Sequence, residues 1–244
     1  MGFLDRLATL WSRSPAAPAT AARPPPVAPP WQAPPLADVL LQLAWQDPEQ
    51  WATVLAPHVK RHAIDATGPR LAGFLANAGH ETNGGRRLVE SMDYTPDRLG
   101  QVFGARATRE ALAACRRDGR PADQRAIANI VYGGEWGRRN LGNTRPGDGW
   151  AYRGRGLMQV TGRNNYVAMG MQVGMSLDLL SSAMEAREGA ADTACRWWDA
   201  AGCNALADAG DLNALRRRVN GGLNGLAEVE ARHRAALHAL GVAP

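Results

Sequence analysis

The chain has 244 residues, of which 45% are hydrophobic and 21% charged. This suits one large or two small globular domains with a real buried core. Lys and Arg exceed Asp and Glu by 28 to 23, a net charge of +5, which favours an anionic partner without choosing among nucleic acid, a membrane surface and an acidic polymer. No stretch approaches the roughly 18 to 20 apolar residues of a membrane-spanning helix, which argues against an integral membrane protein.

Cysteine usage adds little. Cys115, Cys195 and Cys203 are too few and too scattered for a disulfide framework or a structural zinc site. A bridge between Cys195 and Cys203 would require a helix to end between them. Three reduced thiols are the favoured interpretation.

The first 35 residues differ from the rest, because they hold nine of the sixteen prolines. Such a segment favours extended polyproline conformation and is not expected to build a core. Residues 1–11 place apolar side chains at helical spacing, which fits either a helix that contacts a membrane surface or a functionless terminus. Asp5 and Arg6 interrupt the apolar run, so we expect no cleavable signal peptide. The predicted organisation is an N-terminal segment, 1–35, and a globular domain, 36–244.

From residue 36 onward the signals are helical. Cap-and-proline patterns predict helix starts at Asp47-Pro48, Thr67-Gly68-Pro69 and Thr95-Pro96. Alanine-rich stretches predict further helices at 108–117, 123–131, 188–201, 211–219 and 226–240. Only 90–94 and 151–160 resemble strands, so the expected fold is mainly α with a minor β-hairpin. The glycine-rich tract 132–162 is expected to be one long loop lining a groove for an extended polar ligand.

Metal and nucleotide cofactors are not expected. His80-Glu81 begins like the zinc-protease motif HExxH, but Gly84 stands where the second histidine would be. The chain has neither a third glycine after Gly154-Arg155-Gly156 nor a Walker lysine nor a GxSxG elbow.

Two carboxylates could instead perform acid–base chemistry. Glu81 is predicted at the C-terminal end of an apolar helix, where the helix dipole and an apolar wall would favour the neutral form that a general acid needs. Glu90 follows nine residues later, across a turn, where it could face Glu81 over a cleft. Glycoside cleavage uses such a pair, one acid for the leaving oxygen and one base for water. The spacing alone also fits two solvated surface acids.

Three segments carry a family resemblance. Residues 74–85, FLANAGHETNGG, closely resemble the HET-x-GG signature of glycoside hydrolase family 19, which contains plant-type chitinases and many bacteriophage endolysins. Residues 152–166, YRGRGLMQVTGRNNY, are similar to its YYGRGPIQLS…NY motif, and residues 219–222, VNGG, to its INGG turn. The segments follow the family's order, and the resemblance implies a lysozyme-like, two-lobed helical hydrolase.

The resemblance also implies site residues. Glu81 matches the family's general acid, and Thr161 stands where a Ser or Thr helps to hold the attacking water. The remaining matches are to sugar-contacting residues: Gln159, Asn165 and Asn220. Glu90 departs from the plant chitinases, whose second carboxylate lies much further along, and fits the close spacing of the endolysin-like branch, before the pair Asp93-Tyr94. Asp93 remains the rival for the base.

Other residues have two interpretations each. His80 could orient Glu81 or the loop above it, or be a partly buried structural histidine. Tyr152 and Trp150 could stack on sugar rings or pack within the loop. The run 216–218, three arginines, is expected on a solvated helix face, and Trp197-Trp198 in the core.

The family resemblance therefore implies an inverting glycosidase that cleaves β-1,4 bonds between N-acetylhexosamines, and the pair of carboxylates agrees with it. Peptidoglycan is favoured over chitin as substrate because of the endolysin spacing, the few cysteines and the positive charge. We expect a monomer, made in the bacterial cytoplasm, that acts on the cell wall, with a holin or its N-terminal helix as its route there. A chitinase, or a catalytically inactive glycan-binding relative, is the alternative. A nucleic-acid-binding protein is disfavoured because no recognised binding motif appears.

Overall fold

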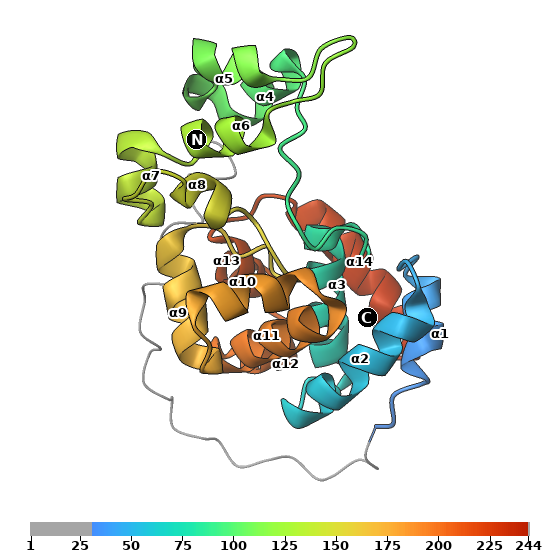
Figure 1. Ribbon diagram of the computed structural model, residues 1–244. Helices are drawn as coiled ribbons and strands as arrows, with labels where there is room; N and C mark the ends of the chain where they lie inside the picture. The colour runs from blue at the N-terminus through green and yellow to red at the C-terminus, as the bar shows by residue number, and fades with distance from the viewer. Residues whose placement is uncertain (1–30, 244) are drawn as a thin grey trace.

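The computed structural model describes residues 31–243, and this part of the chain is mainly α-helical (Figure 1). The first helices are α1 (Leu36–Gln42), α2 (Pro48–Arg61), α3 (Gly68–Thr82), α4 (Pro96–Phe103), a 3-10 turn η3 (Gly104–Arg106), α5 (Arg109–Ala114) and α6 (Gln124–Val131). They are followed by α7 (Gly134–Leu141), α8 (Asp148–Ala151), α9 (Arg163–Val173), α10 (Leu177–Glu185), α11 (Arg187–Ala200), α12 (Cys203–Asp208), α13 (Leu212–Asn220) and α14 (Leu226–Ala239). The prediction of a mainly helical fold is confirmed.

Two separate hydrophobic cores define two lobes. The main lobe is built around α3, which packs along α14 and whose residues from Leu71 to Ala78 are all buried. Phe74 meets Trp198 of α11 edge to face, with ring centroids 5.4 Å apart. The prediction that Trp197 and Trp198 belong to the core is confirmed, since both are buried.

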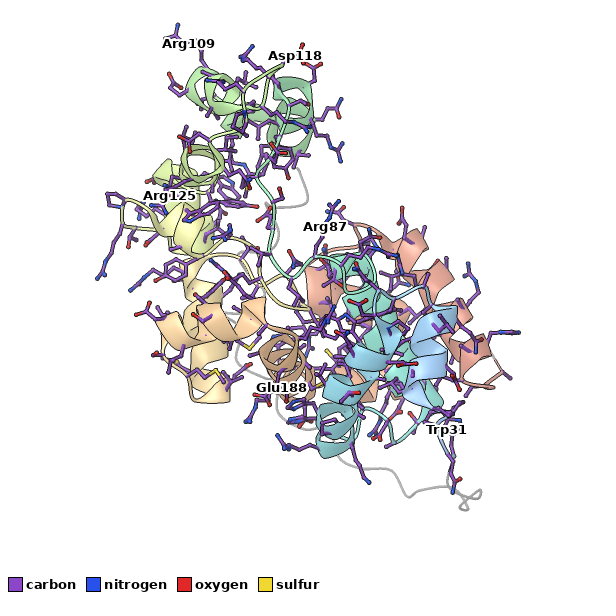
Figure 2. All side chains as sticks on the ribbon, turned by 45° about the vertical axis from the view of Figure 1, so that its right-hand side comes forward. Trp31, Arg87, Arg109, Asp118, Arg125 and Glu188 are labelled. Atoms are coloured by element: carbon purple, nitrogen blue, oxygen red, sulfur yellow. The ribbon has the colours of Figure 1, made fainter. Side chains whose placement is uncertain are left out.

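The small lobe comprises α4 to α8 and has its own core, which includes Leu99, Phe103, Ile127, Val131 and Tyr132. Figure 1 shows these helices as a group above the main body, and Figure 2 places Arg109 and Asp118 at its outer end. The chain enters this lobe after α3 and leaves it before α9, so both connections pass through one junction (Figure 1).

The two connections pair with each other at the junction. Gly156 donates a backbone hydrogen bond to Leu88, and the amide of Glu90 donates to Gly154, at 2.8 Å each. Arg155 forms isolated antiparallel bridges with Val89 and Val160. The predicted minor hairpin is therefore present only as isolated bridges in the described residues, and 90–94 is not itself a strand.

The predicted helix starts at Thr67 and Thr95 are confirmed, because each side chain accepts a hydrogen bond from the amide three residues later. The start of α2 at Pro48 is also confirmed, but the prediction that Asp47 caps it is wrong. Asp47 adopts a left-handed conformation, with φ 48°, and its carboxylate pairs with Arg187 of α11. A partner distant in sequence has taken the group that would have capped the helix.

The prediction of a single long loop over 132–162 is wrong in part, because α7 and α8 lie within it. The three cysteines are free, as predicted, and all three are buried. The predicted N-terminal segment, 1–35, falls mostly outside the described residues, and so does the helix predicted within residues 1–11. Trp31 packs against the core of the main lobe. Among the helices described, none combines the length and apolar character needed to cross a membrane.

Candidate active site

Glu81 occupies the last turn of α3, as predicted, and a buried cation lies against it. Nη1 of Arg216, on α13, donates to Glu81 Oε1 at 2.7 Å and to the buried Asn77 Oδ1 at 3.3 Å. Nε of Arg216 donates to the carbonyl of Asn224 at 2.8 Å. The prediction of an apolar wall around Glu81 is therefore wrong, because a guanidinium occupies that place.

Arg216 also corrects the prediction for the arginine run. Its side chain is fully buried, whereas Arg217 and Arg218 are exposed as expected. The helical periodicity already indicated that Arg216 differs from its two neighbours in burial, because it falls on the same face of α13 as Leu212 and Val219. Three successive charged residues suggest a solvent-exposed helix face, but successive residues of a helix point in different directions, so one of the three can still be buried.

His80 supports the loop that follows Asn220. A Cβ atom at Gly225, which has φ 71°, would come within 2.4 Å of His80 Nε2, so the imidazole fills the space where a side chain would be. Burial lowers the pKa of His80 and favours the neutral ring. This arrangement agrees with the interpretation that His80 orients the loop above Glu81.

Asn220 ends α13, one helical turn after Arg216. It is 1% exposed, and within residues 31–243 neither its amide oxygen nor its amide nitrogen has a hydrogen-bond partner. A buried amide without partners costs free energy unless a ligand or water pairs with it. This feature fits the predicted sugar-binding role.

The Thr and Gly residues of the HET-x-GG segment serve the fold. Thr82 donates to the carbonyl of Ala78 at 2.6 Å and accepts from the amide of Gly85 at 2.9 Å, which turns the chain sharply after α3. Gly85 has φ 74°, and a Cβ atom there would lie 2.4 Å from Nε1 of Trp51. The motif therefore fixes the direction in which the chain leaves Glu81.

Glu90 lies at the junction, and its two carboxylate oxygens are held from different sides. The hydroxyl of Tyr132 donates to Oε1 at 2.7 Å, and the amide of Gly154 donates to Oε2 at 3.0 Å. Burial raises the pKa of Glu90, while these two hydrogen bonds and the charge of Arg153 oppose the rise. Its rival Asp93 is exposed and lies 3.7 Å from Arg116.

Gln159 reaches the same point from the second connection. Its Nε2 donates to the carbonyls of Gly156, at 3.0 Å, and Arg87, at 3.3 Å. A Cβ atom at Gly154 would lie 2.9 Å from Gln159 Oε1 and 3.2 Å from Glu90 Oε2, so the glycine lets these groups converge. Gln159 itself has φ 46°, an uncommon conformation for a residue other than glycine and one often found at functional sites.

Thr161 and Asn165 continue this segment. The buried Thr161 hydroxyl donates to the carbonyl of Gln159 at 3.0 Å, which leaves its oxygen able to accept. Asn165 Nδ2 donates to the carbonyl of Thr161 at 2.7 Å. Hydrogen bonds thus link Gln159, Thr161 and Asn165 in series, and Gln159 is the member of the series that lies close to Glu90.

Tyr152 and Trp150 take part in packing. The Tyr152 ring meets Tyr166 edge to face at 5.2 Å, and the guanidinium of Arg153 covers Trp150 at 3.7 Å. Arg155 donates to the Tyr166 hydroxyl at 2.8 Å and pairs with Glu185 at 2.6 Å. The arginines of the YRGRG segment therefore anchor it to α9 and α10.

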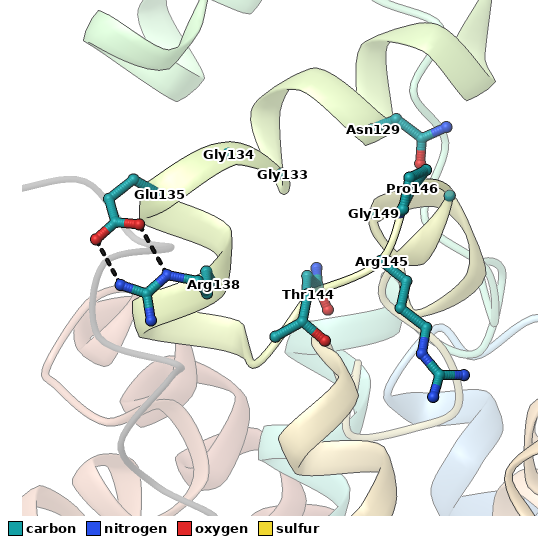
Figure 3. Close-up of a pocket in the computed structure, with 11 residues that line it drawn as sticks. Asn129, Gly133, Gly134, Glu135, Arg138, Thr144, Arg145, Pro146 and Gly149 are labelled. Atoms are coloured by element: carbon teal, nitrogen blue, oxygen red, sulfur yellow. Dashed lines mark hydrogen bonds and ion pairs between the residues drawn. The ribbon is translucent and has the colours of Figure 1, made fainter.

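A pocket of about 480 Å³ lies in the small lobe, between the start of α7 and the turn before α8 (Figure 3). Glycines and polar side chains line it, and Glu135 and Arg138 form a two-point ion pair at its edge. None of the predicted site residues lines this pocket.

Sequence reasoning missed Tyr132, which it had assigned to the start of the loop. The apolar positions of α6, Ile127, Ala128 and Val131, already indicated that this face continues into the small-lobe core. Tyr132 and Arg216 both act on carboxylates more than 40 residues away in sequence, which periodicity cannot reveal.

Known proteins include relatives of this chain in sequence and in fold. No family model matches the chain. A curated relative from Haemophilus influenzae, a glycosyl hydrolase family 19 domain-containing protein, is 36% identical over 157 residues, which is 64% of this chain and 73% of the relative. The crystal structure of chitinase C from Streptomyces griseus superposes with a TM-score of 0.53 at 16% identity, covering 85% of this chain and 92% of that one. A class IV family 19 chitinase from Zea mays gives 0.46 at 18% identity, covering 82% and 84%.

The helical architecture is the lysozyme-like fold of chitinase C. The extent and identity of the match to the Haemophilus influenzae relative place it further: the chain belongs to glycoside hydrolase family 19.

Proposed function

We propose that this glycosidase cleaves β-1,4 bonds between N-acetylhexosamines of peptidoglycan by an inverting acid–base mechanism, with the endolysin branch of the family as its nearest functional type. The observation that carries this proposal is the pair of carboxylates and their buried donors. Glu81, at the end of α3, is held by Arg216. Glu90, at the junction of the two connections, is held by Tyr132 and Gly154.

Glu81 is the proposed general acid. When it gives its proton to the leaving oxygen it becomes a carboxylate, and the guanidinium of Arg216 stabilises that negative charge through a hydrogen bond already in place. The second oxygen of Glu81 remains the proton carrier.

Glu90 is the proposed general base. Its raised pKa makes its carboxylate a stronger base than an exposed glutamate, closer to the working pH at which proton transfer is efficient. The Thr161 oxygen can accept a hydrogen bond from the attacking water, and the Gln159 amide lies beside the same carboxylate. Asn220 offers an unpaired amide to an N-acetyl or hydroxyl group of the sugar.

The choice of peptidoglycan rests on three features of the chain. The second carboxylate follows the first by only nine residues, the chain has three free cysteines, and its net charge of +5 suits an anionic wall. Chitin is the second candidate substrate, because the structural neighbour from Streptomyces griseus is a chitinase.

Parallel assays on purified peptidoglycan and colloidal chitin test the substrate, with Glu81→Gln as the inactive control. The proposal requires faster release of reducing ends from peptidoglycan. NMR during early turnover should show the α-anomer first, since inversion of a β-bond yields it. Faster hydrolysis of chitin would contradict the proposal that peptidoglycan is the substrate. Early release of the β-anomer would contradict the inverting mechanism.

The proposed place of action is the bacterial cell wall, reached through a holin or through contact of the N-terminal segment with a membrane, and the proposed active form is a monomer. Deleting residues 1–30 should leave hydrolysis of soluble wall fragments unchanged while weakening binding to anionic liposomes. Sedimentation at several concentrations measures the oligomeric state. Unchanged liposome binding would contradict the membrane contact.

A further inference from the structure

Tyr132 connects the core of the small lobe to the proposed base. It follows α6, and its fully buried ring meets Phe103 edge to face with centroids 5.7 Å apart. Its hydroxyl leaves this aromatic core and donates to Glu90 Oε1 at 2.7 Å. Both rotatable bonds of the side chain are therefore constrained by packing, which gives the donor a fixed position.

The backbone of Tyr132 is fastened to the main lobe as well. Asn143 Nδ2 donates to the Tyr132 carbonyl at 2.8 Å, and Asn143 Oδ1 accepts from the amide of Arg163, the first residue of α9, at 3.0 Å. Asn143 is buried and uses its amide in both directions. The position of Tyr132 is thus set at the junction of the lobes.

The second oxygen of Glu90 is held independently. Gly154 donates to Oε2 at 3.0 Å, and the amide of Glu90 donates back to Gly154 at 2.8 Å. With only this clamp, the carboxylate could still rotate about its last bond. The Tyr132 hydroxyl removes that freedom.

We infer that Tyr132 is a positioning residue for Glu90, because its hydroxyl orients the carboxylate toward the water and favours the ionised form that acts as the base. This inference rests on the proposed role of Glu90 as the base.

The charged and titratable groups that face Glu90 define the expected pH effect. They are Tyr132 after α6, Tyr94 in the first connection and Arg153 in the second. Burial and the charge of Glu90 raise the pKa of Tyr132 far above its ordinary value, so its hydroxyl keeps its proton and remains a donor. Removal of this donor leaves Arg153 and Gly154 to stabilise the carboxylate, and the pKa of Glu90 must rise.

The test is Tyr132→Phe, which keeps the ring and removes the hydroxyl. The acidic limb of the kcat/KM profile, where the base must lose its proton, should move up by about one pH unit. We expect kcat to fall about tenfold with KM nearly unchanged, because a misoriented base affects the chemical step more than substrate binding. The matched control is Phe103→Leu, which loosens the same aromatic core and keeps the hydroxyl.

Phe103→Leu should lower Tm while leaving the acidic limb in place. If Tyr132→Phe lowers Tm but does not move the limb, or if Phe103→Leu moves it equally, Tyr132 is only structural and the inference is wrong. In a Glu90→Gln background, Tyr132→Phe should reduce the residual activity by no more than about twofold, because the two residues act as one unit. Full activity of Glu90→Gln would instead refute the proposed base, an outcome distinct from failure of the inference.

Discussion

The main lobe and the small lobe hold their carboxylates with opposite kinds of groups. On the main lobe, Glu81 receives a hydrogen bond from the buried guanidinium of Arg216, a permanent positive charge. At the small lobe, Glu90 receives hydrogen bonds from a neutral hydroxyl and a backbone amide. A cation stabilises a carboxylate as its negative charge develops, whereas at Glu90 burial raises the pKa more than the two neutral donors lower it. Two identical side chains thereby acquire different chemistry.

This comparison teaches how one reaction can use the same residue type twice. Opposed roles require surroundings that differentiate two carboxylates. Here the difference arises because the donors come from separate lobes. Arg216, the donor to Glu81, lies on α13 of the main lobe, and Tyr132, the donor to Glu90, directly follows α6 of the small lobe. Variants that exchange or remove these surroundings should separate the two roles.

The largest effect is expected for Glu81→Gln. An amide of the same shape cannot donate the proton, so hydrolysis of the natural glycan should fall at least about 10²- to 10⁴-fold while Tm changes little. An oligosaccharide with a dinitrophenyl leaving group needs no protonation and should retain most of its rate. Residual activity on the natural glycan above about a tenth of wild type would contradict the role of Glu81.

Glu90→Gln should reduce activity by a similar factor, but a different experiment distinguishes it from Glu81→Gln. Azide can replace the activated water, so it should restore turnover of an activated substrate in this variant and not in Glu81→Gln. If Asp93→Asn proves more damaging than Glu90→Gln, the base is Asp93.

The same variant should alter the pH dependence of stability. A carboxyl group whose pKa is raised on folding contributes stability that is present below its unfolded pKa and is lost as pH rises through the folded pKa. Glutamine does not titrate, so the Tm of Glu90→Gln relative to wild type should increase from about pH 4 to neutrality. A constant difference in Tm across this range would show that burial does not penalise the charge of Glu90.

Arg216→Gln should have an intermediate effect on activity, about 10- to 100-fold. It should also lower Tm strongly, since it leaves Glu81 and Asn77 without their buried partner. The control is Arg217→Gln, one residue away and exposed, which should change stability by less than about 0.5 kcal/mol. Equal effects of the two substitutions would show that the buried contact does not matter.

The smallest effect is expected at Thr161. Thr161→Val keeps the shape and removes the hydroxyl, so kcat should fall more than substrate affinity, whereas Thr161→Ser should be far milder because the hydroxyl remains. Steady-state kinetics with both variants measures this difference. A serine variant as impaired as the valine variant would point to packing of the methyl group in this buried position.

The sequence by itself determined the local features of this protein. Thr67 and Thr95 before prolines start helices because a threonine oxygen can accept the first free amides, a property of neighbouring residues. The motif glycines and the two glutamates could likewise be recognised in the sequence. Glu81 lies in the last turn of its helix, as predicted. Such features depend on residues close in the chain.

Only the tertiary structure decided what surrounds each glutamate. Arg216 and Glu81 are 135 positions apart, and Tyr132 and Glu90 are 42 apart, so no periodic pattern links them. Of three successive arginines, the fold buries the one that finds a carboxylate and an amide to satisfy its charge, because a guanidinium without partners would be too costly to bury. The residue types were given by the chain, but their environments, and hence their chemistry, arise where two separately packed cores meet.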